Sequence, residues 1–339
     1  MRKMNKANHW LPMKPHLLRR SSQTVFLGVC LWIGWRFVEF YFYSLSMGGP
    51  LVSRPPGVEA FLPISGLMSA RYWLQTHIIH PVHPAGLLIF GAVVTVSFLF
   101  KRSFCSWVCP FGLVSEKLAD MGCAVFGRNF LLPKRADWPL RSLKYLILGF
   151  FVWVIFFGMD LTGLREFLDS SYNKTADVRL LLFFLHPSTT TVAVLAALIG
   201  LSVLIRYFWC RYLCPYGALL GLVGLLSPAR IKRNIPSCIE CGKCARVCPA
   251  SLPVNKLATV HSDECSLCLE CVQSCPVADT LSVGAAFSRF RIGPLLIAST
   301  IALIFLFTFI LGKACGHWQT SVTPDQAARQ IKQLQYILP

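Results

Sequence analysis

Eight cysteines in two short runs carry the clearest chemical signal in the sequence. Residues 238–249 read CIECGKCARVCP and residues 265–276 read CSLCLECVQSCP. Each run has the spacing C-x₂-C-x₂-C-x₃-C-P, in which three close cysteines wrap one [4Fe–4S] cluster and the fourth ligates the neighbouring cluster. Zinc, the alternative, needs four ligands per ion and no exchange between runs. The spacing therefore predicts two clusters, held by Cys238, Cys241, Cys244 and Cys275 and by Cys265, Cys268, Cys271 and Cys248.

A second pair of cysteine motifs lies earlier in the chain. Residues 105–112 read CSWVCPFG and residues 210–217 read CRYLCPYG, and each motif follows an apolar stretch with a His-Pro pair (His83-Pro84 or His186-Pro187) upstream. Such a repeat indicates a duplicated membrane unit with functional groups between its copies. If the copies pack about a pseudo-twofold axis, Cys105, Cys109, Cys210 and Cys214 converge. Four thiolates could hold a metal ion or a further cluster; disulfides or plain buried thiols are the alternative.

The composition predicts a membrane protein, because 55% of the 339 residues are hydrophobic and only 14% are charged. A membrane span needs about 20 apolar residues. Five stretches qualify: Thr24–Leu45, Pro84–Phe100, Leu143–Leu164, Leu180–Ile205 and Ile292–Leu311. Lys144, inside the third, is expected to reach toward the headgroups. Two shorter apolar runs, 111–126 and 213–226, are expected to form interfacial or re-entrant helices.

We therefore predict an all-α membrane protein with about five transmembrane helices, an internal repeat and a small α+β ferredoxin-like domain that holds two [4Fe–4S] clusters. The expected parts are a basic N-terminus (1–23), a membrane domain with the two His-Pro/C-x₃-C-P repeats (24–229), the double-cluster domain (230–288), a last transmembrane helix (289–312) and a tail (313–339).

The distribution of Lys and Arg predicts the orientation. With five spans, most of these residues fall on the side that holds the N-terminus and the double-cluster domain, and such an excess marks the cytoplasmic side. The N-terminus and clusters are therefore expected in the cytoplasm, with the multi-pass chain in a bacterial inner membrane and the C-terminus in the periplasm. Because this asymmetry accounts for most of the net charge of +18, no nucleic-acid partner is expected.

Four polar residues near or inside the spans are weaker candidates. His83 and His186 could ligate haem or a metal or take a proton from a quinol; interfacial hydrogen bonding is the simpler reading. Arg36 and Glu39 lie one helical turn apart inside the first span, so they are expected to pair with each other or to line a polar pocket. A quinone site and a structural salt bridge are equally compatible with that pair.

Paired C-x₃-C-P motifs at span ends, followed by a double-cubane ferredoxin, resemble the NapH/NosR/CcoG group of polyferredoxin-type membrane proteins. The resemblance covers about residues 20–285. It implies electron transfer between the quinone pool or cytoplasmic donors and respiratory reductases, or a part in metal-enzyme maturation. The chain departs from the group in its extra last span, in a tail with Cys315 and His317, and in having no large flavin domain ahead of the first span.

We therefore expect an electron-transfer subunit that connects a quinone pool or cytoplasmic donor to a periplasmic or membrane redox partner. Two other functions stay open: a metal reductase, for example of copper, that serves maturation of a respiratory metalloenzyme, and a membrane redox sensor. The sequence leaves open whether haem or flavin is bound.

Overall fold

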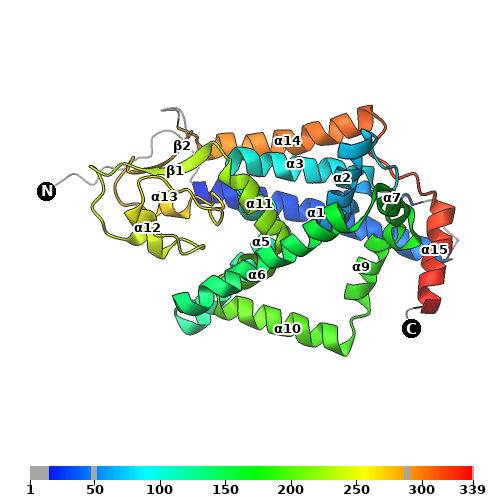
Figure 1. Ribbon diagram of the computed structural model, residues 1–339. Coiled ribbons are helices and arrows are strands. Elements are labelled where there is room, and N and C mark those ends of the chain that lie inside the picture. The colour runs from blue at the N-terminus through cyan, green and yellow to red at the C-terminus, as the bar shows by residue number, and fades with distance from the viewer. Residues whose placement is uncertain (1–14, 47–51, 286–290, 338–339) are drawn as a thin grey trace. The chain divides into compact units, whose positions relative to one another are not determined.

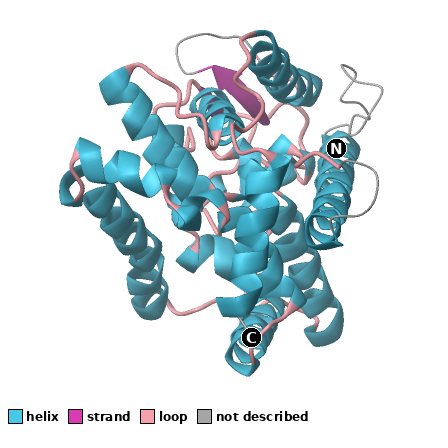
Figure 2. Cartoon of the chain, turned by 90° about the vertical axis from the view of Figure 1, so that its right-hand side faces the viewer, coloured by secondary structure: helices cyan, strands magenta, loops and turns pink. Residues whose placement is uncertain are grey.

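The computed structural model of the chain describes residues 15–46, 52–285 and 291–337. Most of the predicted N-terminal segment and the junction at 286–290, where the predicted double-cluster domain ends, lie outside these residues. Helices make up most of the described chain, and the sheet is small (Figure 2). The chain divides into two compact units: Met1–Leu27, Val93–Leu148 and Leu198–Ile304 form unit 1, and Gly28–Ala92, Gly149–Ala197 and Phe305–Pro339 form unit 2.

Three helices in the described part of the chain are long and apolar enough to cross a bilayer. They are Pro15–Leu45 within α1 (Pro15–Ser46), Arg135–Gly158 within α6 (Lys134–Trp153) and the following π-helix η2 (Val154–Gly158), and α14 (Pro294–Ala314). The first and last agree with the predicted spans. The predicted third span extended too far, to Leu164, because Asp160 begins a new helix, α7 (Leu161–Asp169), by accepting a hydrogen bond from the Gly163 N–H.

The predicted fourth span is not one continuous helix. It is divided between α9 (Ala176–Leu185) and α10 (Thr189–Leu204), which are bent by 82°. Pro187 has no N–H for a helical hydrogen bond, and the Ser188 hydroxyl accepts from the Thr191 N–H 3.2 Å away at the start of α10. The predicted second span is α3 (Pro84–Phe100), an apolar helix of 17 residues.

The order of elements repeats around the two C-x₃-C-P motifs. In the first copy, α3 is followed by α4 (Ser103–Trp107) and α5 (Pro110–Phe126); in the second, α10 is followed by the π-helix η3 (Trp209–Leu213) and α11 (Pro215–Leu225). Cys109 and Cys214 each take the N-cap position, and the next residue is the proline that opens the helix. The two shorter apolar runs are thus helical, as predicted.

Close backbone approaches fix the first copy and join it to the second. A Cβ on Gly112 would lie 2.0 Å from the Cys105 carbonyl oxygen, and one on Gly122 would lie 1.8 Å from the Val203 carbonyl oxygen. Only glycine therefore allows α5 to approach α10 and the turn of Cys105 this closely.

The double-cluster domain belongs to unit 1 and is α+β, as predicted (Figure 1). Strands β1 (Ala229–Arg233) and β2 (Leu281–Ala285) pair antiparallel, with Ala229 opposite Ala285 and Ile231 opposite Val283. Between them lie the short helices α12 (Lys243–Arg246), η4 (Val254–Lys256) and α13 (Glu270–Gln273). Pairing of β1 with β2 thus holds together the two ends of the segment that carries the eight cysteines.

Unit 2 contains η1 (Pro56–Phe61), α2 (Pro63–Thr76), α7, α8 (Ser171–Lys174) and α9. One apolar cluster joins Met68, Tyr72, Ile155, Leu164 and Leu168. Another joins Phe40 of α1 to Ile331 of the tail helix α15 (Pro324–Ile337). The tail is therefore packed into this unit.

Candidate electron-transfer centres

The eight cysteines of the double-cluster domain line two pockets. Cys238, Cys241, Cys244 and Cys275 line the first, which has about 350 Å³ of empty volume. Cys248, Cys265, Cys268 and Cys271 line the second, with about 380 Å³. Each pocket takes three cysteines from one run and the last cysteine from the other. These are the two predicted ligand sets, and their binding of iron stays a prediction.

The backbone of the two runs has the same unusual shape. Two and four residues after its first cysteine, each run has a positive φ: at Glu240 and Gly242 in the first run, and at Leu267 and Leu269 in the second. Left-handed residues of this kind aim successive N–H groups into an anion-binding concavity. A hydrogen bond from Arg233, followed by one from the Glu240 N–H, lowers the pKa of Cys238. Four thiols with N–H donors beside them suit an iron–sulfur cluster.

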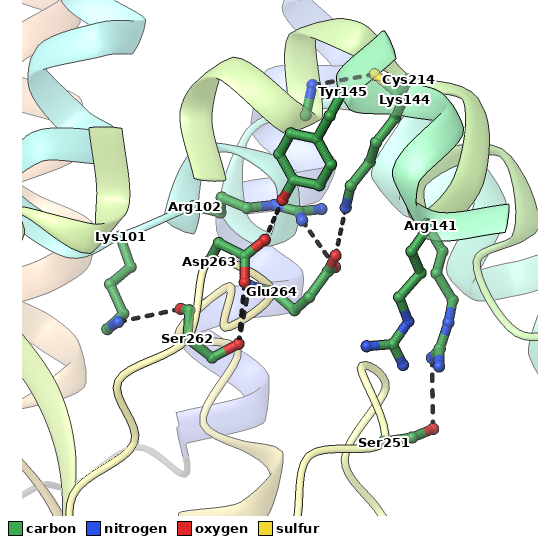
Figure 3. A network of polar contacts seen from close by, with 12 residues as sticks. Lys101, Arg102, Arg141, Lys144, Tyr145, Cys214, Ser251, Ser262, Asp263 and Glu264 are labelled. Atoms are coloured by element: carbon green, nitrogen blue, oxygen red, sulfur yellow. Dashed lines mark hydrogen bonds and ion pairs between the residues drawn. The ribbon is translucent and has the colours of Figure 1, made fainter. Parts of the chain in front are cut away.

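Two acidic residues before Cys265 hold the loop of the second pocket in place (Figure 3). Glu264 forms ion pairs with Arg102, 3.0 Å away, and with Lys144, while the Tyr145 hydroxyl donates to Asp263. Lys144 is 0% and Glu264 8% exposed. The expectation that Lys144 reaches toward the headgroups was therefore wrong. Its side chain is buried and paired with Glu264.

The charges around Asp263 keep it ionised. Burial by itself would raise the pKa of Asp263, but the hydrogen bond from Tyr145 and the positive charge of Lys144 bring that pKa below its usual value. A carboxylate held in this way keeps the loop attached at neutral pH.

Further contacts to the second pocket come from both copies of the repeat. From the first copy, Ser106 donates to the Ser266 carbonyl (2.6 Å) and the Trp107 ring N–H donates to the Leu267 carbonyl (3.1 Å). From the second copy, Arg211 donates to Ser251, three residues after Cys248, at 3.4 Å. The segments that carry the cysteines of this pocket are thus fixed to both C-x₃-C-P segments.

Arg19 of α1 adds a buried ion-pair network on the same loop. Its guanidinium contacts both carboxylate oxygens of Glu116, at 2.8 and 2.7 Å, and one oxygen of Glu270, at 2.7 Å. Because Glu270 begins α13, this network joins the N-terminal helix, α5 and the segment that carries Cys268 and Cys271.

The four C-x₃-C-P cysteines lie near one another in unit 1. Burial, followed by the nearby Cys105 and Cys210 thiols, raises the pKa of Cys109, and burial raises the pKa of Cys210 to about 12. The positive charge of Arg102 lies close to Cys105, Cys210 and Cys214. The four cysteines therefore share one neighbourhood, and their role as a metal or cluster site stays a prediction. Within the described ranges, no three His, Cys, Asp or Glu side chains are placed to hold a single metal ion.

The weaker candidates fall into different surroundings. His83 is buried, with Nε2 2.8 Å from the Asn173 carbonyl and Nδ1 3.3 Å from Arg54 Nη2 and from Glu59 Oε1. His186 is exposed at the break between α9 and α10. The repeat therefore does not give the two histidines a common environment. Arg36 and Glu39 pair with each other at 2.5 Å, as expected.

Sequence reasoning missed buried charges in both units. In unit 2, Arg54 pairs with Asp177 at 2.6 Å and lies 3.6 Å from Glu59, with all three side chains buried. In unit 1 it missed Arg19, Glu116 and Glu264. The one available signal was the placement of Asp263 and Glu264, two adjacent acids in a basic chain, immediately before Cys265, a predicted cluster ligand.

Two family models match this part of the chain. A 4Fe-4S binding domain matches residues 82–133 and again residues 188–234. A 4Fe-4S dicluster domain matches residues 230–276. The double match coincides with the two copies of the repeat, and the dicluster match with the eight cysteines of the two pockets.

Known proteins resemble the chain over most of its length. It is 40% identical over 325 residues to the "Putative electron transport protein YccM" of Escherichia coli, covering 93% of this chain and 90% of that protein. It is 28% identical to the ferredoxin-type protein NapH of Escherichia coli over 80% of this chain and 90% of NapH. Protein NirI of Paracoccus denitrificans is also 28% identical over 70% of this chain, which spans 34% of NirI.

No solved structure matches the chain. The resemblance to the NapH group is confirmed by the relatives, and an electron-transfer role by both the relatives and the family models. The chain therefore belongs to the NapH/NosR-type polyferredoxin family of membrane iron–sulfur electron-transfer proteins.

Proposed function

We propose that the chain transfers electrons between a quinone pool or cytoplasmic donor and a respiratory redox partner. One observation carries this proposal: buried contacts fix the loop of the second cysteine pocket to both C-x₃-C-P segments, and Arg102 lies beside both Glu264 and the thiols of Cys105, Cys210 and Cys214. A ferredoxin attached only by a tether would not need such contacts. The attachment through Arg102 supports a route between the second pocket and the C-x₃-C-P thiols.

The residues of the two pockets have distinct parts in this proposal. Cys238, Cys241, Cys244 and Cys275 would hold one [4Fe–4S] cluster, and Cys248, Cys265, Cys268 and Cys271 the other. When bound, each cluster supplies one-electron oxidation and reduction. Arg233 and the Glu240 N–H favour the thiolate form of Cys238 and so tune the first site.

The four C-x₃-C-P cysteines are proposed to hold a third redox centre. Two cubanes contribute about 8 iron per chain, so a further cubane would raise the iron content to about 12. The expected result is that Cys105→Ser or Cys210→Ser removes the additional iron, whereas Cys123→Ser, at an exposed thiol, does not. An iron content of about 8 that neither motif variant changes would rule out a third cluster.

We also propose that the double-cluster domain lies on the cytoplasmic side of a bacterial inner membrane and the tail on the periplasmic side. The distribution of Lys and Arg supports this orientation. Arg36 and Glu39, paired inside α1, are the candidate contacts for a quinone. His83 is a weaker one, since both ring nitrogens already have protein partners.

Quinol oxidation by the purified protein tests the functional proposal. Under anaerobic conditions a quinol analogue should reduce the clusters and bleach their visible absorption. This reaction should be faster than the reduction of a copper salt by protein that has been reduced beforehand. If copper is reduced rapidly while the quinol leaves the absorption unchanged, the maturation function would replace respiratory electron transfer. The copper arm is run on protein first reduced with dithionite, so that both reactions start from a defined state.

A further inference from the structure

We propose that the first cysteine pocket is the outer end of the electron route and that its surface docks an acidic, soluble one-electron donor protein. The surface is the loop 233–246. Its exposed members are Asn234, Ile235, Pro236, Ile239, Glu240, Lys243 and Arg246. The inference rests on the proposed electron-transfer function and adds to it the entry point and the kind of donor.

Equivalent positions of the two cysteine runs differ sharply in burial. Two residues after the first cysteine, the first run has the exposed Glu240, while the second run has Leu267, which is 1% exposed. Two residues further on, the second run has Leu269, which is 4% exposed. Both runs have the same backbone shape, so the difference lies in what covers them. The second run is covered by protein, and the first faces outward.

The covering contacts surround the ligands of the second pocket. Contacts on the segment 264–267, which contains Cys265, come from Arg102, Lys144, Ser106 and Trp107. Arg211 donates to Ser251, beyond Cys248. The first pocket is lined by Ile239, whose side chain is 59% exposed. A soluble protein can therefore approach the first pocket without displacing any of these contacts.

The composition of the exposed loop indicates the kind of partner. Ile235, 56% exposed, and Ile239 give it an apolar centre, and an apolar patch within a charged rim is typical of protein interfaces. Isolated exposed isoleucines are common on protein surfaces, but these two lie within one turn, with the Cys238 N–H bonded to the Ile235 carbonyl. The exposed charged residues of the loop are Lys243 and Arg246 against Glu240, a net side-chain charge of +1.

The two exposed cations, Lys243 and Arg246, favour an acidic partner, because complementary charge steers association and raises its rate. In the transfer step one electron leaves the reduced carrier and enters the chain at the first pocket. No bond forms and no proton is required. The carrier is released in its oxidised form.

Stopped-flow reduction of the purified full-length protein with its clusters tests the inference, with the hydroquinone form of an acidic flavodoxin as the probe. Lys243→Glu should lower the second-order rate constant about three- to tenfold at low ionic strength, and Glu240→Lys should raise it. Both differences should disappear in about 0.5 M salt, where the Debye length is only a few ångströms. Arg128→Glu, an equal charge reversal in the connection after α5, is the matched control and should not change the rate constant.

Reduction by dithionite separates the two possible failures. If dithionite reduces the clusters but flavodoxin does not, or reduces Lys243→Glu as fast as the unaltered protein, the docking surface is wrong while the electron-transfer function stands. An Arg128→Glu variant slowed as much as Lys243→Glu would also overturn it, because the effect would then come from overall charge. Protein that dithionite cannot reduce at all would contradict the proposed function itself.

Discussion

Replacing Glu264 with Gln should destabilise the second cysteine pocket strongly. The change leaves Arg102 and Lys144, both buried, without their shared carboxylate. Removing one partner of a buried ion pair costs about 3–5 kcal/mol, since the remaining charge stays desolvated. We therefore expect the midpoint for thermal loss of cluster absorption to fall by roughly 10 °C.

The matched control is Glu270→Gln on the same cysteine run. Glu270 is 30% exposed, and its partner Arg19 keeps both contacts to Glu116 when Glu270 is changed. Partly exposed ion pairs contribute up to about 1 kcal/mol, so this variant should lose its clusters within a few degrees of the unaltered protein. Equal midpoints for the Glu264 and Glu270 variants would show that the Glu264 contacts do not hold the pocket.

The second large effect concerns the exchange of cysteines between the two runs. Single variants such as Cys275→Ser should each lose one cluster, about 4 iron per chain, because a cubane needs four cysteine ligands. Double variants show which cysteines act together. Cys275→Ser combined with Cys241→Ser should still keep the roughly 4 iron of the second pocket, because both cysteines line the first pocket. Cys275→Ser combined with Cys268→Ser should keep none of the iron of the two pockets, because it removes a ligand from each.

Ligand sets without exchange give the opposite result. Cys275 and Cys268 belong to the same run, so their double variant would then retain one cluster and the Cys275/Cys241 variant would retain none. EPR of the reduced proteins provides a second readout. Magnetic interaction between two clusters is lost whenever one of them is absent.

Local spacing made much of the site predictable. The distances between cysteines in each run, and the matched C-x₃-C-P motifs, depend only on short stretches of chain. These spacings indicated which cysteines share a pocket and that the four C-x₃-C-P cysteines lie near one another. The long apolar helices α1 and α14 were predictable for the same reason, since a continuous apolar run determines them.

Contacts between distant segments were not predictable in this way. Lys144 and Glu264 are 120 residues apart, and hydropathy alone cannot show that a lysine inside an apolar stretch has a buried partner. The break at His186-Pro187 was hidden by apolar residues on both sides, although Pro187 itself was a signal for it. The resemblance of His83 to His186 in sequence likewise did not indicate that only His83 would be enclosed by Arg54, Glu59 and Asn173.

Iron and acid-labile sulfide analysis of the anaerobically purified chain, joined with EPR, tests the central claim most directly. That claim is that the eight cysteines of the two pockets hold two electron-carrying [4Fe–4S] clusters. It predicts at least about 8 iron and about 8 labile sulfide per chain, with the EPR signals of reduced cubanes after dithionite. Zinc in place of iron, or iron without labile sulfide, would contradict it.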